Sequence, residues 1–234
     1  MRYSCILLIL FILSINFGIF ADAASQEVRI SHFVSSVEVL HQGEVIAIQR
    51  NQDEENTINP AYAKTSRQCP PFCIQPSSLG SGIETVAELE VLDYLNRIRK
   101  GDDTIVVIDS RPEEWMEYGT IPGTINIPWT TLDPAHADPV TVDEIIEKVF
   151  NGRKQDGRWD FSAAKTLVLF CSGLWCGLSS ANIHALRDLG YPADKLKWYR
   201  GGMQAWETVG LTTVKSTSGD PTSLGCKSCP LPRK

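Results

Sequence analysis

The spacing of apolar residues along the chain changes repeatedly between the strand pattern and the helix pattern. Continuous apolar, β-branched runs at 104–108 and 166–170 predict strands that are buried on both faces. Shorter segments predict two further strands, at 124–127 and 197–199. Apolar residues at helical spacing predict four helices, over 85–99, 141–150, 178–189 and 203–209. This alternation predicts an α/β fold of three layers, with a central, mostly parallel sheet and helices on both faces.

Two S/T-x-x-E patterns indicate where helices begin. Thr85 precedes Glu88, and Thr141 precedes Glu144, at the spacing in which two side chains cap the first helical turn reciprocally. We therefore expect Thr85 and Thr141 to be the N-caps of the first two helices.

The segment before residue 83 has a different pattern and is predicted to be an extension of the main domain. Residues 37–40 and 45–48 flank His-Gln-Gly-Glu and predict a β-hairpin. A rigid Cys69-Pro-Pro-Phe-Cys73 segment follows, and then a linker of Ser and Gly. We assign 24–82 to the extension, 83–215 to the main domain and 216–234 to a flexible tail that contains cysteines.

The first 23 residues are predicted to be a signal peptide. Arg2 precedes an apolar run from Cys5 to Phe20, and Ala21-Asp-Ala23 matches an A-x-A cleavage pattern. An uncleaved membrane anchor is the alternative, but the run is at the short end of the ~20 residues that a span needs. Cleavage after Ala23 predicts a periplasmic or secreted protein with no stable membrane span.

Composition narrows the class of partner. The chain has 234 residues, of which 43% are hydrophobic and 21% charged, as is typical of a globular protein. Its formal net charge is -6 and it has no long basic run, so nucleic acid is not expected as a partner.

Removal of the signal would leave six cysteines: Cys69, Cys73, Cys171, Cys176, Cys226 and Cys229. An even number in an oxidising compartment favours disulfides, although the sequence does not choose the pairing. Two other interpretations stay open for Cys69/Cys73 and Cys226/Cys229. They are a four-cysteine zinc site, and a C-terminal C-x-x-C that exchanges electrons or sulfur with Cys171.

Cys171 follows directly after the predicted buried strand at 166–170, at the edge where parallel sheets bind ligands. Gly173 and Gly177 lie in the loop behind it, and a predicted helix comes next. N–H groups of such a loop and of a helix N-terminus stabilise negative charge, so we expect a thiolate that is a good nucleophile. The alternative is a buried, inert cysteine at a strand end.

Four motifs resemble those of a rhodanese domain and occur in the same order. They are Val107-Ile-Asp-Ser-Arg-Pro-Glu-Glu-Trp115, Gly119-Thr-Ile-Pro-Gly-Thr-Ile-Asn-Ile-Pro128, Cys171-Ser-Gly-Leu-Trp-Cys-Gly177 and Trp198-Tyr-Arg-Gly-Gly-Met-Gln-Ala-Trp206. The chain therefore resembles an exported, bacterial rhodanese-like protein, and the resemblance covers most of the chain after residue 83.

The resemblance implies a sulfurtransferase that carries sulfur as a persulfide on Cys171, from thiosulfate or another sulfane donor to a thiol or protein acceptor. It implies Asp109 and Arg111 as further catalytic residues, with Arg111 tying the active loop or lending positive charge. The implied donor-binding loop consists of Ser172, Gly173, Leu174, Trp175, Cys176 and Gly177. The expected partners are a small sulfur-containing anion or a persulfide donor and a periplasmic protein acceptor, with no cofactor and no metal. The alternative for Asp109 and Arg111 is a structural salt bridge that holds two loops.

The chain departs from the family pattern in two ways. The active loop is longer, and Leu178 and Ser179 stand where the family has a basic residue, so anion binding would rest on backbone dipoles. Phosphatase chemistry is not expected either, because it needs an Arg directly after Cys-x5 to hold phosphoryl oxygens, and Gly177 stands at that position. The second departure is Cys176, which could resolve a persulfide or sulfenate on Cys171 to a disulfide; the alternative is a packed cysteine.

Three functions stay open at this point. They are a sulfurtransferase, a thiol-disulfide redox protein that uses Cys171 and Cys176, and a non-catalytic rhodanese-like module that binds a partner protein. The altered loop is the feature that keeps the second and third functions open.

Overall fold

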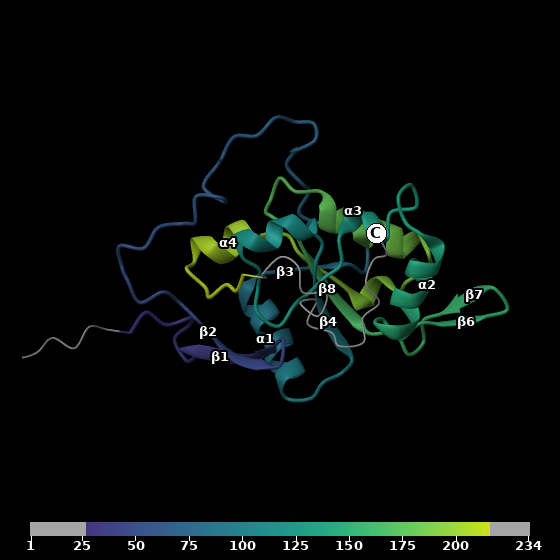
Figure 1. The fold of residues 1–234 in the computed structure, drawn as a ribbon, viewed down its shortest axis with the longest axis horizontal. Coiled ribbons are helices and arrows are strands. Elements are labelled where there is room, and N and C mark those ends of the chain that lie inside the picture. The colour runs from purple at the N-terminus through teal and green to yellow at the C-terminus, as the bar shows by residue number, and fades with distance from the viewer. Residues whose placement is uncertain (1–26, 216–234) are drawn as a thin grey trace, which may run out of the picture.

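The computed structural model describes residues 27–215 (Figure 1). The predicted signal peptide, residues 1–23, and the tail with Cys226 and Cys229 lie outside the described residues. None of the helices within 27–215 is both long and apolar enough to cross a membrane.

Five parallel strands form the central sheet in the order β3-β9-β8-β4-β5. Their bounds are β3 (Glu84–Val86), β4 (Ile105–Asp109), β5 (Ile125–Asn126), β8 (Thr166–Phe170) and β9 (Leu196–Tyr199). The two runs predicted from β-branched residues are the neighbouring strands β4 and β8, which pair from Ile105 with Thr166 to Asp109 with Phe170. The carboxyl ends of β4 and β8 therefore meet at one edge of the sheet.

Helices cover both faces of this sheet. They are α1 (Glu88–Arg99), α2 (Pro139–Lys148), α3 (Leu178–Asp188) and α4 (Gly202–Thr208). The core on one face includes residues of α1 and α4, and the core on the other face includes residues of α2 and α3. Residues of β8 alternate between these cores, Leu167 and Leu169 in the second and Val168 and Phe170 in the first. The predicted three-layer α/β fold is confirmed.

The predicted N-caps of the first two helices are wrong. Ala87 is the N-cap of α1, and its N–H donates to Glu90 Oε2 at 3.0 Å, while Thr85 lies in β3. Asp138 caps α2, and one of its carboxylate oxygens accepts from the N–H of Thr141 at 3.1 Å. At the start of both helices, more than one polar side chain lies within a single turn. The side chain that caps the helix is not the one that the S/T-x-x-E pattern indicates.

The hairpin of the extension is confirmed. It consists of β1 (Ser36–His41) and β2 (Glu44–Gln49), joined through Gln42 and Gly43, which both have positive φ, at 52° and 86°. Val39 and Ile48 on its inner side are buried in the core that also contains α1 and α4. The extension is therefore packed onto the main domain.

A second hairpin, which was not predicted, projects from the opposite side of the molecule to β1 and β2 (Figure 1). It consists of β6 (Arg153–Gln155) and β7 (Arg158–Asp160), joined by an Asp-Gly turn. Three short 3-10 helices complete the described elements, at Glu113–Tyr118, Trp129–Thr131 and Ala193–Lys195.

Candidate active site

The loop after β8 begins with Cys171, at the carboxyl edge of the sheet. The N–H groups of Met203 and Gln204 donate to the carbonyl oxygens of Cys171 and Ser172, both at 2.9 Å, so the first turn of α4 holds the start of the loop. Gly202 permits this close approach, because it has a φ of +56° and a Cβ there would overlap the carbonyl oxygen of Cys171.

The loop brings Cys171 and Cys176 together. Their sulfur atoms lie at disulfide distance and their Cα atoms are 6.3 Å apart, within the range of protein disulfides. Both residues are buried, with 3% of Cys171 and 5% of Cys176 exposed, and Trp175 packs in the same small cluster. The structure therefore describes a closed loop in which the candidate nucleophile is paired and covered.

Five N–H groups of the loop have no acceptor within residues 27–215. They belong to Ser172, Gly173, Leu174, Trp175 and Gly177. The remaining N–H, that of Cys176, donates to the carbonyl of Gly173 at 2.9 Å. Unpaired N–H groups of a curled loop, followed by the N-terminus of α3, are groups that can bind an anion. The residues proposed to bind the sulfur donor thus have N–H groups that are free to donate hydrogen bonds to it.

Asp109 and Arg111 form a fully buried ion pair, with both side chains 0% exposed and Arg111 Nη2 2.5 Å from Asp109 Oδ2. Arg111 also donates from Nε to Asp109 at 2.9 Å, from Nη1 to the Tyr62 hydroxyl at 2.6 Å and from Nη2 to the Gly119 carbonyl at 2.8 Å. In the described part of the chain, no hydrogen bond or ion pair joins Arg111 to 171–177. This is the geometry of a structural salt bridge that holds the chain around Tyr62 and Gly119.

An indirect connection leads from Arg111 to the active loop. The carbonyl of Tyr62 accepts from Gln204 Nε2 at 2.9 Å, and Gln204 Oε1 accepts from Trp175 Nε1 at 3.3 Å. Burial alone would lower the pKa of Arg111, but the charge and hydrogen bonds of Asp109, together with Tyr62, outweigh burial and raise that pKa, so the guanidinium stays charged. Arg111 can therefore position the loop through Tyr62 and Gln204.

The extension also lies directly on the loop, through the segment 67–76. The N–H of Gln75 donates to the carbonyl of Leu174 at 2.8 Å, and the Ser180 hydroxyl donates to Gln75 Oε1 at 3.3 Å. Arg200 donates to the carbonyls of Gln75 and Pro76, both at 2.7 Å. We call segment 67–76 the cap. The sequence showed the rigid Cys69-Pro-Pro-Phe-Cys73 segment but not its contact with the loop, because an irregular segment is positioned by tertiary contacts and not by a periodic pattern.

Two side chains of the cap cover Trp175. Phe72 meets the indole edge to face, with ring centroids 5.6 Å apart. The guanidinium carbon of Arg67 lies 3.7 Å from the centroid of the indole ring. Arg67 and Phe72 are thus residues of the site that the sequence analysis did not identify.

Cys69 and Cys73 within the cap are joined as a disulfide, with Cα atoms 4.6 Å apart. This pairing favours the disulfide interpretation over a zinc site for these two cysteines. Within residues 27–215, no three side chains of His, Cys, Asp or Glu gather as metal ligands would.

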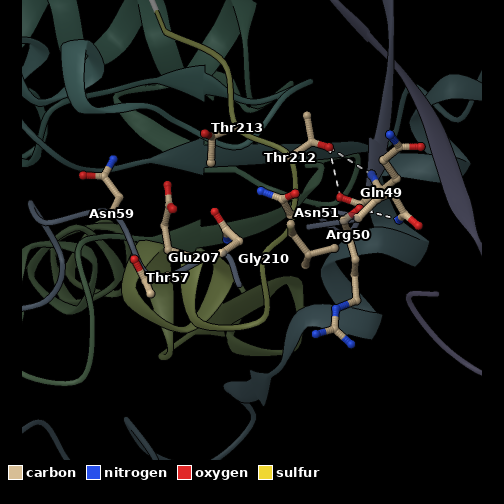
Figure 2. A pocket seen from close by; sticks show the side chains of 12 residues that line it. Gln49, Arg50, Asn51, Thr57, Asn59, Glu207, Gly210, Thr212 and Thr213 are labelled. Atoms are coloured by element: carbon tan, nitrogen blue, oxygen red, sulfur yellow. Dashed lines mark hydrogen bonds between the residues drawn. The ribbon is translucent and has the colours of Figure 1, made fainter. Parts of the chain in front are cut away.

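A separate cavity lies between the end of β2, residues 56–59 and the segment 207–213 (Figure 2). Its volume is about 610 Å³, and no residue of the active loop lines it. Glu207 Oε1 is buried at this cavity without a hydrogen-bond partner among the described residues, and burial raises the pKa of Glu207. The amide and hydroxyl side chains that line the cavity offer no nucleophile for sulfur chemistry.

Comparison with known sequences identifies one family. The family model described as a rhodanese-like domain matches residues 91–208, which include Asp109, Arg111 and the active loop. A curated relative, a helix-turn-helix-type transcriptional regulator of Mycobacterium tuberculosis, is 28% identical over 133 residues, which are 57% of this chain and 46% of that protein. This chain therefore spans less than half the length of that relative.

Solved structures with related folds are more distant. A human single-domain sulfurtransferase is 24% identical over 52% of this chain and 93% of its own, with a TM-score of 0.31. A Rhodopseudomonas palustris protein, described as of unknown function and a possible tyrosine phosphatase, is 24% identical over 58% of this chain and 88% of its own, with a TM-score of 0.36. Similarity at this level does not indicate an activity.

Proposed function

Because the chain belongs to the rhodanese-like domain family, we propose that it is a sulfurtransferase that carries sulfur as a persulfide on Cys171. Membership of this family supports sulfur transfer in general terms. The observation that carries the specific proposal is the position of Cys171. It stands at the carboxyl end of the central strand β8, at the head of a loop with five N–H groups that have no acceptor among the described residues.

In the proposed reaction the Cys171 thiolate attacks the outer sulfur of thiosulfate or of another sulfane donor. A bond forms between Cys171 Sγ and that sulfur, the sulfur–sulfur bond of the donor breaks, and sulfite leaves with the electron pair when thiosulfate is the donor. Free N–H groups of the loop stabilise the negative charge of the persulfide. A thiolate of the acceptor then attacks the outer sulfur and restores the Cys171 thiolate.

The pair of cysteines sets a condition on this chemistry. Cys171 attacks only as a free thiolate, so the bond to Cys176 has to be reduced first. Once the persulfide is formed, the Cys176 thiolate can attack Cys171 Sγ, close the disulfide and release the outer sulfur as hydrosulfide. In this step the two cysteine thiols together lose two electrons, and the sulfane sulfur gains them. Cys176 is therefore the resolving thiol of the proposal.

Asp109 and Arg111 enter the proposal as positioning residues. Their ion pair holds Tyr62, and Tyr62 holds Gln204 beside the loop. From the signal peptide expected at residues 1–23, we propose that the reaction takes place in the periplasm or outside the cell, with a small sulfur-containing anion or persulfide as donor and a protein thiol as acceptor.

A second candidate function is favoured by the closeness of the two sulfur atoms. A thiol-disulfide redox protein would cycle Cys171 and Cys176 between dithiol and disulfide and would carry no sulfane sulfur. The two functions differ in whether an additional sulfur atom is ever bound.

Intact-mass measurement of the reduced protein after exposure to thiosulfate, together with assays of the sulfite and hydrosulfide released, distinguishes these functions. The wild type should release sulfite and then hydrosulfide, and Cys171→Ser should release neither. A protein that exchanges disulfides with a dithiol partner but never releases sulfite or gains a sulfur atom would be a redox protein. A protein that does neither would overturn both enzymatic proposals and leave a binding module.

A further inference from the structure

The active loop and the first turn of α3, residues 171–180, contain no basic residue. Thiosulfate and related donors are anions, and their sulfonate oxygens lose water when they enter a site. Backbone N–H groups compensate part of that loss, but a full positive charge is the stronger partner. A cation for the donor would therefore have to come from a residue packed against the loop.

Arg67 of the cap meets this requirement. Its guanidinium lies over the face of Trp175, and Trp175 belongs to the same buried cluster as Cys171 and Cys176. Arg67 is thus packed on a residue of the small cluster that contains both sulfur atoms.

The charge of Arg67 is not neutralised by the protein. Within residues 27–215 it forms no ion pair, and its Nε is buried without a hydrogen-bond acceptor. Burial lowers the pKa of Arg67 from its usual value of 12.5. Arg67 as a whole is partly exposed, but a cation that has lost part of its hydration without gaining a counter-charge is stabilised by an incoming anion.

Other basic residues near the loop are less suited to this role. Arg200 is already committed, because its guanidinium donates to the carbonyls of Gln75 and Pro76 and so holds the cap in place. Lys64 lies in the same stretch of the extension and is exposed. Arg67 is thus the cation that the cap presents to Trp175.

We infer that Arg67 is the anion-binding residue of the sulfur site, and that it recognises the negatively charged oxygens of a sulfonate-type donor such as thiosulfate. The planar fork of a guanidinium fits two such oxygens at once, which an ammonium does not. The extension therefore supplies in Arg67 the charge that the loop lacks. The inference rests on the proposed function, since it names the residue that binds the donor at the same site.

Two alkylating reagents of matched size test the inference without any sulfur transfer. Iodoacetate carries a negative charge and iodoacetamide does not, and both alkylate a Cys171 thiolate in the reduced full-length protein. Arg67→Gln should slow iodoacetate about tenfold, as expected for loss of a charged hydrogen bond, and change iodoacetamide less than about twofold. Arg67→Lys should retain part of the preference for iodoacetate. Lys64→Gln removes the same charge from the same stretch and should leave both rates unchanged.

Equal changes for the two reagents in Arg67→Gln would overturn the inference, because Arg67 would then only cover the loop. Equal effects of Lys64→Gln and Arg67→Gln would overturn it too, since the preference would then come from the general charge of the extension.

Thiosulfate titrations of the same variants separate this inference from the proposed function. The concentration that gives half-maximal sulfite release should rise about tenfold in Arg67→Gln. An unchanged titration would refute the inference and leave sulfur transfer standing. If no variant released sulfite while the iodoacetate preference still depended on Arg67, sulfur transfer would fail and the anion site would stand.

Discussion

The Sγ atom of Cys171 lies 3.2 Å from the backbone carbonyl oxygen of Cys176. A carbonyl oxygen can accept a hydrogen bond from a thiol, but it offers nothing to a thiolate. With 3% of Cys171 exposed, an incoming donor also has no direct access to the sulfur. For the proposed persulfide to form, reduction of the pair must be followed by a movement of the loop that brings free N–H groups to the sulfur. We therefore propose that the redox state of Cys171 and Cys176 controls access to the site.

Gly202→Ala should displace the loop. The new Cβ would overlap the carbonyl oxygen of Cys171, and the backbone has a φ of +56° there. Gly157→Ala is the matched control, because it also has positive φ, at +76°, but no atom lies within 4 Å of the added Cβ. We expect the control to lose about 1–2 kcal/mol of unfolding free energy in urea, from backbone strain alone. Gly202→Ala should lose clearly more, and equal losses would show that the loop is not held by α4.

Arg111→Ala should unfold the protein far more readily, because it leaves Asp109 as a buried charge without its partner. The expected loss is about 3–5 kcal/mol in chemical denaturation. Tyr62→Phe removes only the hydroxyl that accepts from Arg111 at 2.6 Å and should lose about 1.5–3 kcal/mol. We also expect both variants to form the persulfide more slowly. A slower reaction at unchanged stability would instead place Arg111 in contact with the donor.

The cap should loosen when its disulfide is removed. A bridge between Cys69 and Cys73 closes a loop of very few residues, so the double variant Cys69→Ser/Cys73→Ser should lose about 2 kcal/mol at most. Trp175 should become more accessible at the same time, because Arg67 and Phe72 cover it, and acrylamide quenching of tryptophan fluorescence measures this change. Quenching identical to that of the wild type would mean that the cap stays in place without its bridge.

The hairpin should weaken as the pH falls. Nδ1 of His41 accepts from the N–H of Gly123 at 3.2 Å, and burial lowers the pKa of His41 below its usual 6.5. As the pH falls below 6.5, the unfolded chain binds a proton at His41 more readily than the folded chain does. The full stability is therefore present above pH 6.5 and is lost as the pH falls from 6.5 toward the lower pKa of the folded protein. His41→Asn keeps an acceptor that does not titrate. Urea unfolding should show the wild type losing more stability than His41→Asn between pH 7 and pH 5, and parallel losses would contradict this role.

The sequence predicts the central strands well, because a strand buried on both faces has to be apolar at every position. The run at 166–170 is β8 without change, and the run at 104–108 is β4 shifted by one residue. Helix starts are predicted less well, since Asp138 and Glu90 compete with the expected caps within a single turn. The second hairpin did have a signal, because Asp156-Gly157 is a favoured two-residue turn and has φ values of 48° and 76°.

The residues of the site also differ in how well the sequence predicts them. Cys171 and the loop 172–177 could be placed from the end of a buried strand and from the family motif. The cap could not be predicted, because Arg67 and Gln75 reach the loop across about a hundred residues of sequence through an irregular segment whose course depends on tertiary packing. From the sequence, backbone N–H groups were therefore the only expected binding partners of the donor anion.

The central claim is that Cys171 holds a sulfane sulfur, and the Cys176→Ser variant tests it most directly, because a persulfide formed there cannot be resolved within the loop. The reduced variant is incubated with thiosulfate, trapped with iodoacetamide, digested and mapped by tandem mass spectrometry. We predict one additional sulfur atom on the peptide that contains Cys171, at close to full occupancy, and a shorter-lived adduct in the wild type. A Cys171 peptide that is alkylated without any additional sulfur, under conditions in which the thiol is free, would contradict the account.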